Sequence, residues 1–145
     1  MGEQLTIDEL KKKVGKPWLN LRYDIERGIL VRFAQAIGDD NPRWQGDEAE
    51  APPTLLATLG FETAISALLG LDAIVLHGST DLELYRQVKV GDTIVVAATI
   101  TALRERQTAA GVVAFITLQK DYTNQDGAHV ATCKQLAIVR PGMPL

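Results

Sequence analysis

One segment that is apolar on every side constrains this chain more than any other feature. Pro52 and Pro53 suit the first turn of a helix. The apolar residues that follow cover nearly the whole circumference of a helix: Leu55, Leu56, Leu59, Phe61, Ala64, Ile65, Leu68 and Leu69. Such a helix must be surrounded by other elements, so the pattern predicts a long central helix that ends near Leu69 or Gly70.

The first of two helices predicted before this one begins at a capping box. Thr6 is followed three positions later by Glu9, and such a pair satisfies two free amides at a helix start. The helix is predicted to run through Lys13 and to stop at Gly15.

The second of these helices follows from a four-residue spacing of apolar side chains between Ile25 and Ile37. Asp24 is predicted to cap this helix, and Gly38 to end it. A polar loop then occupies residues 38–46.

After Asp72 the period of the apolar residues changes from 3.6 to 2, which is typical of strands. Strands are predicted at residues 81–90, 93–103, 112–122 and 129–140, with a hairpin turn at residues 124–127. Helices followed by an antiparallel meander indicate an α+β fold, with the sheet wrapped around the apolar helix.

The composition limits the classes of function. The chain has 145 residues, 46% of them hydrophobic, and a net charge of −3, so we expect one domain over residues 1–145 and no nucleic-acid partner. Polar residues interrupt its longest apolar stretch, so no membrane span is predicted. The single cysteine, Cys133, suits a reducing cytoplasm and is expected to be buried and inert.

Three segments in order carry a resemblance: FAQAIGDDNPRW (33–44), APPTLL (51–56) and LHGSTDLELYRQVKVGDTI (76–94). They resemble MaoC-like acyl-thioester dehydratases, in particular the N-terminal, fatty-acid-synthase-like dehydratase type. The resemblance implies a hot-dog fold, paired as a dimer or double domain. It also implies hydration or dehydration of 2-enoyl and 3-hydroxyacyl groups on coenzyme A or acyl-carrier protein, without a cofactor.

In catalytically competent members the polar loop reads G-D-x-N-P-x-H, and its Asp and His together activate water. Hydration needs such a pair, because one group must take a proton from water while an acid returns one to the α-carbon. Here Asp39 and Asn41 match the pattern, but Trp44 stands at the histidine position.

A second departure concerns the donor for the thioester oxygen. The family uses a glycine N–H at the start of the central helix, where this chain has Pro53, which has no N–H. Thr54 is one residue further along and still has one. Both departures indicate a non-catalytic, acyl-chain-binding half, whose partner in a homodimer or heterodimer brings the intact pair.

Three other hypotheses stay open. A self-sufficient homodimeric hydratase would use Asp39 with His77, and a hot-dog thioesterase would use Glu62 as base or nucleophile. The chain could also bind acyl thioesters or lipids without any turnover.

The remaining polar residues give weaker signals. Arg104, Arg106 and Lys120 could contact coenzyme A phosphates, although exposed strand-end charges explain them equally well. His129 is expected at the surface. The chain has only two histidines and one cysteine, and their spacings match no metal-binding motif, so we expect no metal site.

Overall fold

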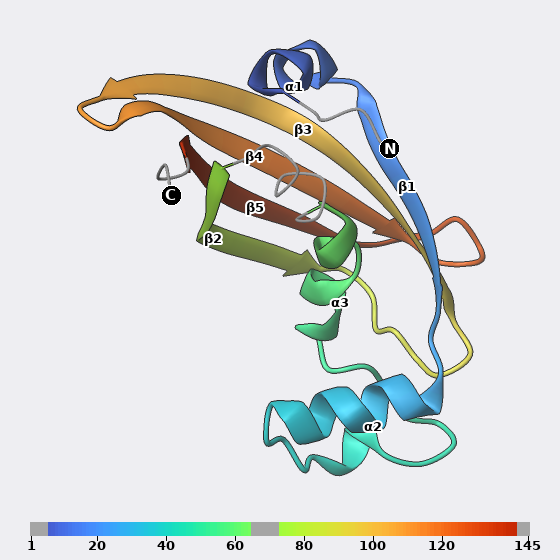
Figure 1. The fold of residues 1–145 in the computed structure, drawn as a ribbon. Helices are drawn as coiled ribbons and strands as arrows, with labels where there is room; N and C mark the ends of the chain where they lie inside the picture. Colours follow the sequence, from blue (N-terminus) through green and yellow to red (C-terminus); the bar gives the residue numbers. More distant parts are fainter. Residues whose placement is uncertain (1–5, 65–72, 142–145) are drawn as a thin grey trace, which may run out of the picture.

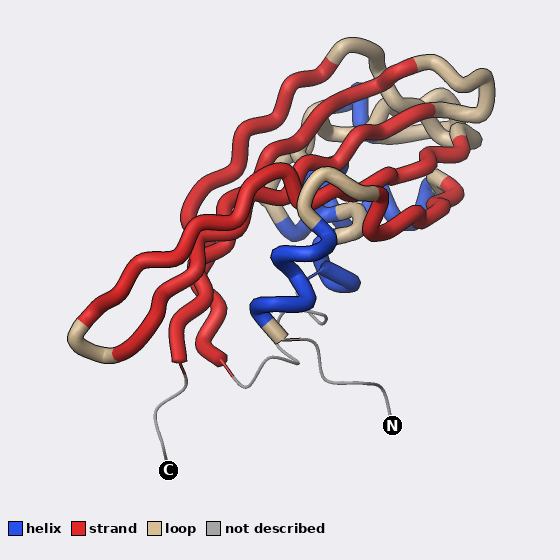
Figure 2. The backbone as a smooth tube through the Cα atoms, turned by 90° about the horizontal axis from the view of Figure 1, so that it is seen from above, coloured by secondary structure: helices blue, strands red, loops and turns tan. Residues whose placement is uncertain are grey.

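The computed structural model describes residues 6–64 and 73–141, which form a curved antiparallel sheet with short helices (Figure 1). The five strands are β1 (Pro17–Asp24), β2 (Ala73–Leu84), β3 (Thr93–Thr108), β4 (Gly111–Thr123) and β5 (His129–Pro141). Their order in the sheet is β1-β3-β4-β5-β2, so β1 and β2 are its edges. Figure 1 shows the short helix α3 (Leu55–Thr58) on the inner side of the curved sheet, as expected for the α+β arrangement, and Figure 2 shows the bend of the strands from above.

Strands β3, β4 and β5 form the predicted meander. The turn at residues 124–127 joins β4 to β5, and the amide of Asn124 donates to the carbonyl of Ala128 at 3.0 Å. Gly127 has φ of 74°, a conformation that glycine adopts without strain. The turn and the two pairings, β3 with β4 and β4 with β5, confirm that part of the prediction.

The strand predicted at residues 81–90 is displaced, because β2 covers Ala73–Leu84 instead. The amides of Tyr85 and Arg86 both donate to the carbonyl of Val130, which ends the regular ladder with β5. Residues 85–90 therefore lie beyond the end of the strand. Strand β1 was not predicted at all.

The helix α1 (Ile7–Lys13) has the predicted capping box between Thr6 and Glu9. The helix α2 (Arg27–Ala36) starts later than predicted, and Asp24 does not cap it. Asp24 is the last residue of β1, and its Oδ1 accepts a hydrogen bond from Thr93 Oγ1 at 3.1 Å. A tertiary contact to β3 thus takes the carboxylate that was predicted to serve as a cap.

The predicted central helix is interrupted in its described part. After the single turn of α3, Leu59 is extended and Gly60 has φ of 78°. The chain becomes helical again at residues 61–64. The predicted continuation to Leu69 or Gly70 lies outside the described residues.

The core divides into two groups of buried side chains along the sheet. Leu55 and Leu56 of α3 pack in one group with Ile94, Val96 and Tyr122 from the strands. The second group contains the following residues of α1, residue 64 and the sheet: Leu10, Ala64, Ala98, Ile100, Ala114, Ile116, Leu118 and Val139. Each helical segment thus covers its own part of the inner face.

Candidate functional site

The polar loop after α2 is held in a defined shape by its own backbone. Gly38 has φ of 67° and reverses the chain, and the amide of Asp39 donates to the carbonyl of Ala34 at 2.9 Å. The loop then enters the 3-10 turn η1 (Pro42–Trp44). Asn41 caps this turn, because its Oδ1 accepts a hydrogen bond from the amide of Arg43 at 3.0 Å.

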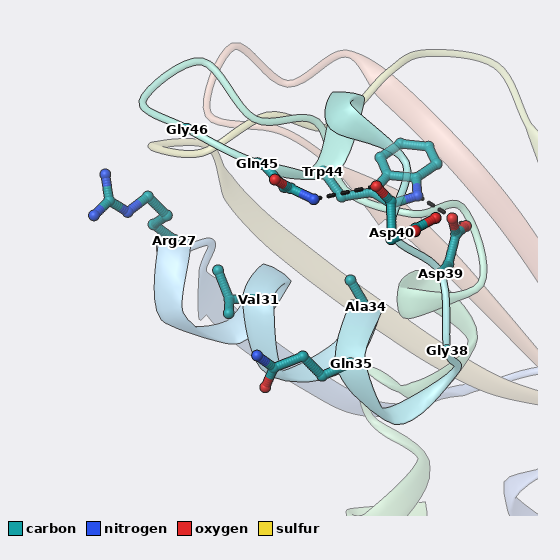
Figure 3. A pocket seen from close by; sticks show the side chains of 10 residues that line it. All are labelled: Arg27, Val31, Ala34, Gln35, Gly38, Asp39, Asp40, Trp44, Gln45 and Gly46. Atoms are coloured by element: carbon teal, nitrogen blue, oxygen red, sulfur yellow. Dashed lines mark hydrogen bonds between the residues drawn. The ribbon is translucent and has the colours of Figure 1, made fainter.

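Both carboxylate oxygens of Asp39 are occupied inside this loop. Oδ1 accepts a hydrogen bond from the amide of Asn41 at 3.0 Å, and Oδ2 accepts one from Trp44 Nε1 at 2.8 Å (Figure 3). Trp44 is only 6% exposed. The residue at the histidine position of the motif is therefore a buried hydrogen-bond donor to Asp39.

The indole ring of Trp44 also contacts Arg43. The guanidinium carbon of Arg43 lies 5.3 Å from the centre of the Trp44 ring. Two nitrogens of Arg43 reach the same oxygen of Glu50, at 2.9 and 2.7 Å. This ion pair links the loop to Glu50 and holds the guanidinium group of Arg43 next to the indole ring of Trp44.

A cavity of about 730 Å³ opens between α2 and the polar loop. Arg27, Val31 and Gln35 line it from α2, and Asp39 and Trp44 line it from the loop (Figure 3). Arg27 forms an exposed ion pair with Asp47 at 2.6 Å. The cavity thus has a partly apolar wall and a charged rim beside the motif.

His77 lies elsewhere, on the edge strand β2. Its Nε2 is 3.0 Å from Thr80 Oγ1, and its ring lies edge-on to Phe61, with the ring centres 6.4 Å apart. His77 lines a smaller hollow, different from the one that Asp39 lines. No hydrogen bond among the described residues joins Asp39 to His77, so the structure of the single chain does not bring the two together.

Pro53 and Thr54 lie exposed at the start of α3. The carbonyl of Pro53 accepts a hydrogen bond from the amide of Leu56 at 3.2 Å, and Thr54 makes no side-chain cap. A helix of one turn has few aligned peptide dipoles, so its field at Thr54 is weaker than that of a long helix.

Glu62 is exposed on the second helical segment. Within the described ranges no ion pair involves the carboxylate of Glu62. It does not line either of the two cavities described above.

Lys120 is the residue whose position the sequence interpretation missed. It is fully buried, not exposed at a strand end, and its Nζ donates to the carbonyls of Ala57 and Leu59 at 2.8 and 3.0 Å. Burial lowers the pKa of Lys120 from 10.5 to about 8. Its ammonium group therefore satisfies two carbonyls at the break in the central helix and is not available to a phosphate.

The neighbours of Lys120 are also buried. Its Nζ lies 5.8 Å from the ring centre of Tyr122, and Cys133 lies opposite it on β5. Burial raises the pKa of the Cys133 thiol, which disfavours the reactive thiolate and agrees with the prediction of a buried cysteine.

Arg104 and Arg106 remain candidates for a phosphate contact. They line a third concavity, of about 460 Å³, together with Phe115 and Leu136. The described residues contain no group of three metal-ligating side chains. In the same ranges no helix is long and apolar enough to cross a membrane.

Comparison with known proteins agrees with the sequence resemblance. Residues 12–133 match the family described as the FAS1-like dehydratase domain region, and the chain belongs to this family. It is thus a MaoC-like hot-dog protein of the dehydratase and hydratase class.

Several relatives carry the name UPF0336 protein. The chain is 38% identical to one from Parafrankia sp. over 57% of its own length and 64% of the relative, so it spans less than two thirds of that protein. It is 30% identical to one from Streptomyces coelicolor over 81% of its own length and 85% of the relative.

Solved structures show the same fold. The HadBC (3R-hydroxyacyl-ACP dehydratase) complex of Mycobacterium tuberculosis has a chain that is 18% identical, with a TM-score of 0.70 over 84% of this chain and 92% of that one. An (R)-hydratase from A. caviae is 22% identical, with a TM-score of 0.67 over 90% and 96%. A hypothetical thioesterase with coenzyme A from Streptococcus pneumoniae is 13% identical, with a TM-score of 0.56 over 86% and 80%.

Proposed function

We propose that this chain is the acyl-chain-binding, non-catalytic half of an acyl-thioester hydratase or dehydratase. The hydrogen bond of 2.8 Å from Trp44 Nε1 to Asp39 Oδ2 carries this proposal. An indole N–H only donates, so Trp44 cannot exchange protons as the histidine of an intact motif does. The carboxylate that remains has both oxygens engaged by the loop, which suits a residue that organises the loop.

The start of α3 supports the same conclusion. Pro53 has no N–H, and the exposed Thr54 precedes only one helical turn. A developing enolate oxygen needs fixed donors, and stronger ones lower the barrier more. We therefore assign Pro53, Thr54, Asn41 and Trp44 to binding or shaping the acyl-thioester site, and the missing acid/base pair to a partner.

The edge strand β2 offers a place for that partner. Residues 76–81 of β2 are exposed in an unbroken run, whereas a strand with one face on a core normally alternates. Leu76 is 44% exposed within this run. An edge strand with free backbone groups and exposed apolar side chains is suited to pairing with another chain.

The partner is either a second copy or a related subunit that carries G-D-x-N-P-x-H. We propose a 2-enoyl or 3-hydroxyacyl group on coenzyme A or acyl-carrier protein as the substrate, and the cytoplasm as the location. The HadBC protein, described as a 3R-hydroxyacyl-ACP dehydratase complex, supports the second arrangement by analogy.

The experiment compares this chain alone with its complex with such a subunit. We expect loss of the conjugated-thioester absorbance of crotonyl-coenzyme A only with the complex. Release of free thiol from acyl-coenzyme A by the chain alone would favour a thioesterase, and Glu62→Gln would then abolish the release. Saturable binding without turnover in either preparation would favour a binding module and contradict the proposal.

A further inference from the structure

The side of the sheet that faces away from the helices lies uncovered in the part of the chain that the structure describes. On the inner side, Leu10 of α1 packs against Ile116 and Val139. Successive side chains of a strand point to opposite faces, so Phe115 and Ile138, the neighbours of these two core residues along β4 and β5, point outward. We call this side of the sheet the outer face.

The charges on the outer face are separated into two ends. Near the turn that joins β3 to β4, the outward positions hold three arginines and, among the described residues, no carboxylate: Arg104, Arg106 and Arg140. Further along the strands the outward positions hold three carboxylates: Asp81, Glu83 and Asp121. Lys134 lies opposite Asp81 in the register and leaves this second end negative. We call the two regions the arginine end and the carboxylate end.

The outer face is partly apolar next to the arginine end. Phe115 and Leu136 line a hollow of about 460 Å³ together with Arg104 and Arg106. Leu76 of the neighbouring strand β2 is 44% exposed. The outward face of an antiparallel sheet normally carries polar residues where water covers it. Exposed apolar side chains bordered by arginines are typical of a surface that contacts another protein.

The carboxylate nearest to the arginine end is already paired. Glu105 also lines the hollow, but its Oε2 lies 2.9 Å from Lys11 Nζ of α1. The positive charge of Arg104 and Arg106 is therefore not balanced from within the chain. A partner of this surface has to supply carboxylates, because like charges across an interface repel.

The outer face itself supplies such carboxylates at its other end. Two copies of the chain are complementary when the arginine end of one meets the carboxylate end of the other. A two-fold axis through the middle of the face produces this arrangement and makes each contact twice. Arg104 and Arg106 lie on β3, whereas Asp81 and Glu83 lie on β2. The axis therefore runs diagonally, and the strands of the two copies cross steeply, as in orthogonally packed sheets.

We propose that the outer face binds the outer face of a second copy of this chain, with the arginine end of each copy against the carboxylate end of the other. Phe115 and Leu136 then lie near the centre of the contact, between the two sets of opposite charges. The inference goes beyond the proposed function and does not depend on it. A subunit that pairs with the backbone edge of β2 leaves the side chains of the outer face free.

Charge reversal at either end tests the contact. Arg104→Glu combined with Arg106→Glu turns the opposite-charge contacts into like-charge contacts. We expect sedimentation velocity of the full chain to show at least about tenfold weaker self-association for this variant. Asp81→Lys combined with Glu83→Lys should weaken self-association to a similar extent. Wild-type behaviour of both variants would overturn the proposal.

A matched control separates this contact from an effect of net charge. Arg32→Glu combined with Arg86→Glu has the same net charge as the arginine-end variant. Both arginines are exposed outside the outer face, on α2 and in the segment after β2. The control should associate as the wild-type chain does, and a loss as large as that of the arginine-end variant would contradict the proposal.

A mixture of the two outer-face variants gives the sharpest test. Their outer faces carry opposite charges throughout, so an equimolar mixture should associate although each variant alone does not. Restored association also shows that both variants fold. A mixture that associates no better than either variant would refute the contact between the two ends. If the mixture associates but no complex with a catalytic subunit hydrates crotonyl-coenzyme A, the proposed function fails and the contact between copies stands.

Discussion

The buried lysine under the interrupted helix gives the most quantitative prediction. Lys120 is fully buried and protonated at neutral pH, since burial lowers its pKa only to about 8. The unfolded chain holds the same proton up to about pH 10.5. Between pH 8 and pH 10.5 the unfolded state binds more protons than the folded state. The free energy of unfolding must therefore rise with pH in this range.

The magnitude follows from the two pKa values. The difference between 10.5 and 8 corresponds to about 3 kcal/mol of lost stability at pH 7, relative to a lysine left in water. This cost is fully present below pH 8 and disappears gradually as the pH rises towards 10.5. Between pH 8 and pH 9 the free energy of unfolding should increase by about 1 kcal/mol through this residue.

Lys120→Met tests this relation. The variant removes the titrating group but also leaves the carbonyls of Ala57 and Leu59 without their donor, at about 1–3 kcal/mol each. The absolute change in stability therefore mixes two opposing effects, whereas the pH dependence isolates the charge. The raised pKa values of Cys133 and Tyr122 lower stability at higher pH, but both residues remain in the variant.

The assay is urea unfolding of both proteins at pH 7, 8 and 9. We expect the stability of the wild-type chain, measured relative to the variant, to increase by about 1 kcal/mol between pH 8 and 9. Lys134→Met removes an exposed lysine next to Cys133 and should follow the wild-type curve. A wild-type-to-Lys120→Met difference that is constant over this range would show that Lys120 is not a buried cation.

The other stability predictions concern the polar loop and two glycines, and urea unfolding measures them all. Trp44→Phe removes the donor to Asp39 Oδ2 and should cost about 1–3 kcal/mol, whereas Trp18→Phe, whose indole N–H makes no side-chain hydrogen bond with the described residues, should cost less. Gly60→Ala should cost at least about 1–2 kcal/mol, because φ is 78° and the new Cβ would lie 3.4 Å from Val96 Cγ1. Gly28→Ala should instead stabilise α2 by about 0.5–1 kcal/mol, since only the flexible end of the Arg32 side chain is near. Equal losses for the two tryptophan variants, or for the two glycine variants, would contradict these assignments.

The elements that could be predicted are those whose signals are local. The capping box of α1, the glycine at the end of α2 and the turn at residues 124–127 depend on a few adjacent residues, and all three are confirmed. Strand β1 also carries a signal, since Leu19, Leu21 and Tyr23 alternate with polar residues. The alternation is short, and β1 has no fully buried residue.

The incorrect predictions depend on contacts between distant residues. Asp24 has the composition of a helix cap, but Thr93, 69 positions away, binds its carboxylate. The central helix has an uninterrupted apolar pattern, yet Tyr23 and Lys120 bind the backbone at the break near Gly60. No local pattern contains these partners.

For Lys120 the strand periodicity gave the right position, but the general preference of lysine for the surface was followed instead. Lys120 continues the alternation of Ile116 and Leu118, which face the core, and this periodicity predicts an inward side chain. The general expectation that lysine is exposed led to the wrong position. The carbonyls of Ala57 and Leu59 are left without helical partners because the helix is interrupted there, and Lys120 binds both.

The candidate site was predictable in its residues but not in its geometry. The motif identified Asp39, Asn41 and Trp44 in one loop, and the structure places them together. The hydrogen bond from the indole to the carboxylate depends on the 3-10 turn of η1, which brings together side chains five positions apart. The motif contained no signal for the separate, smaller hollow that His77 lines.

The central claim is that this chain binds the acyl group but lacks the chemistry. Its most direct test is the hydration of crotonyl-coenzyme A by the purified chain alone, followed by the absorbance of the conjugated thioester. We predict a rate no higher than that without protein, because Trp44 replaces the histidine and already engages Asp39. Turnover by the chain alone that Asp39→Asn abolishes would contradict the claim and establish Asp39 as a catalytic residue.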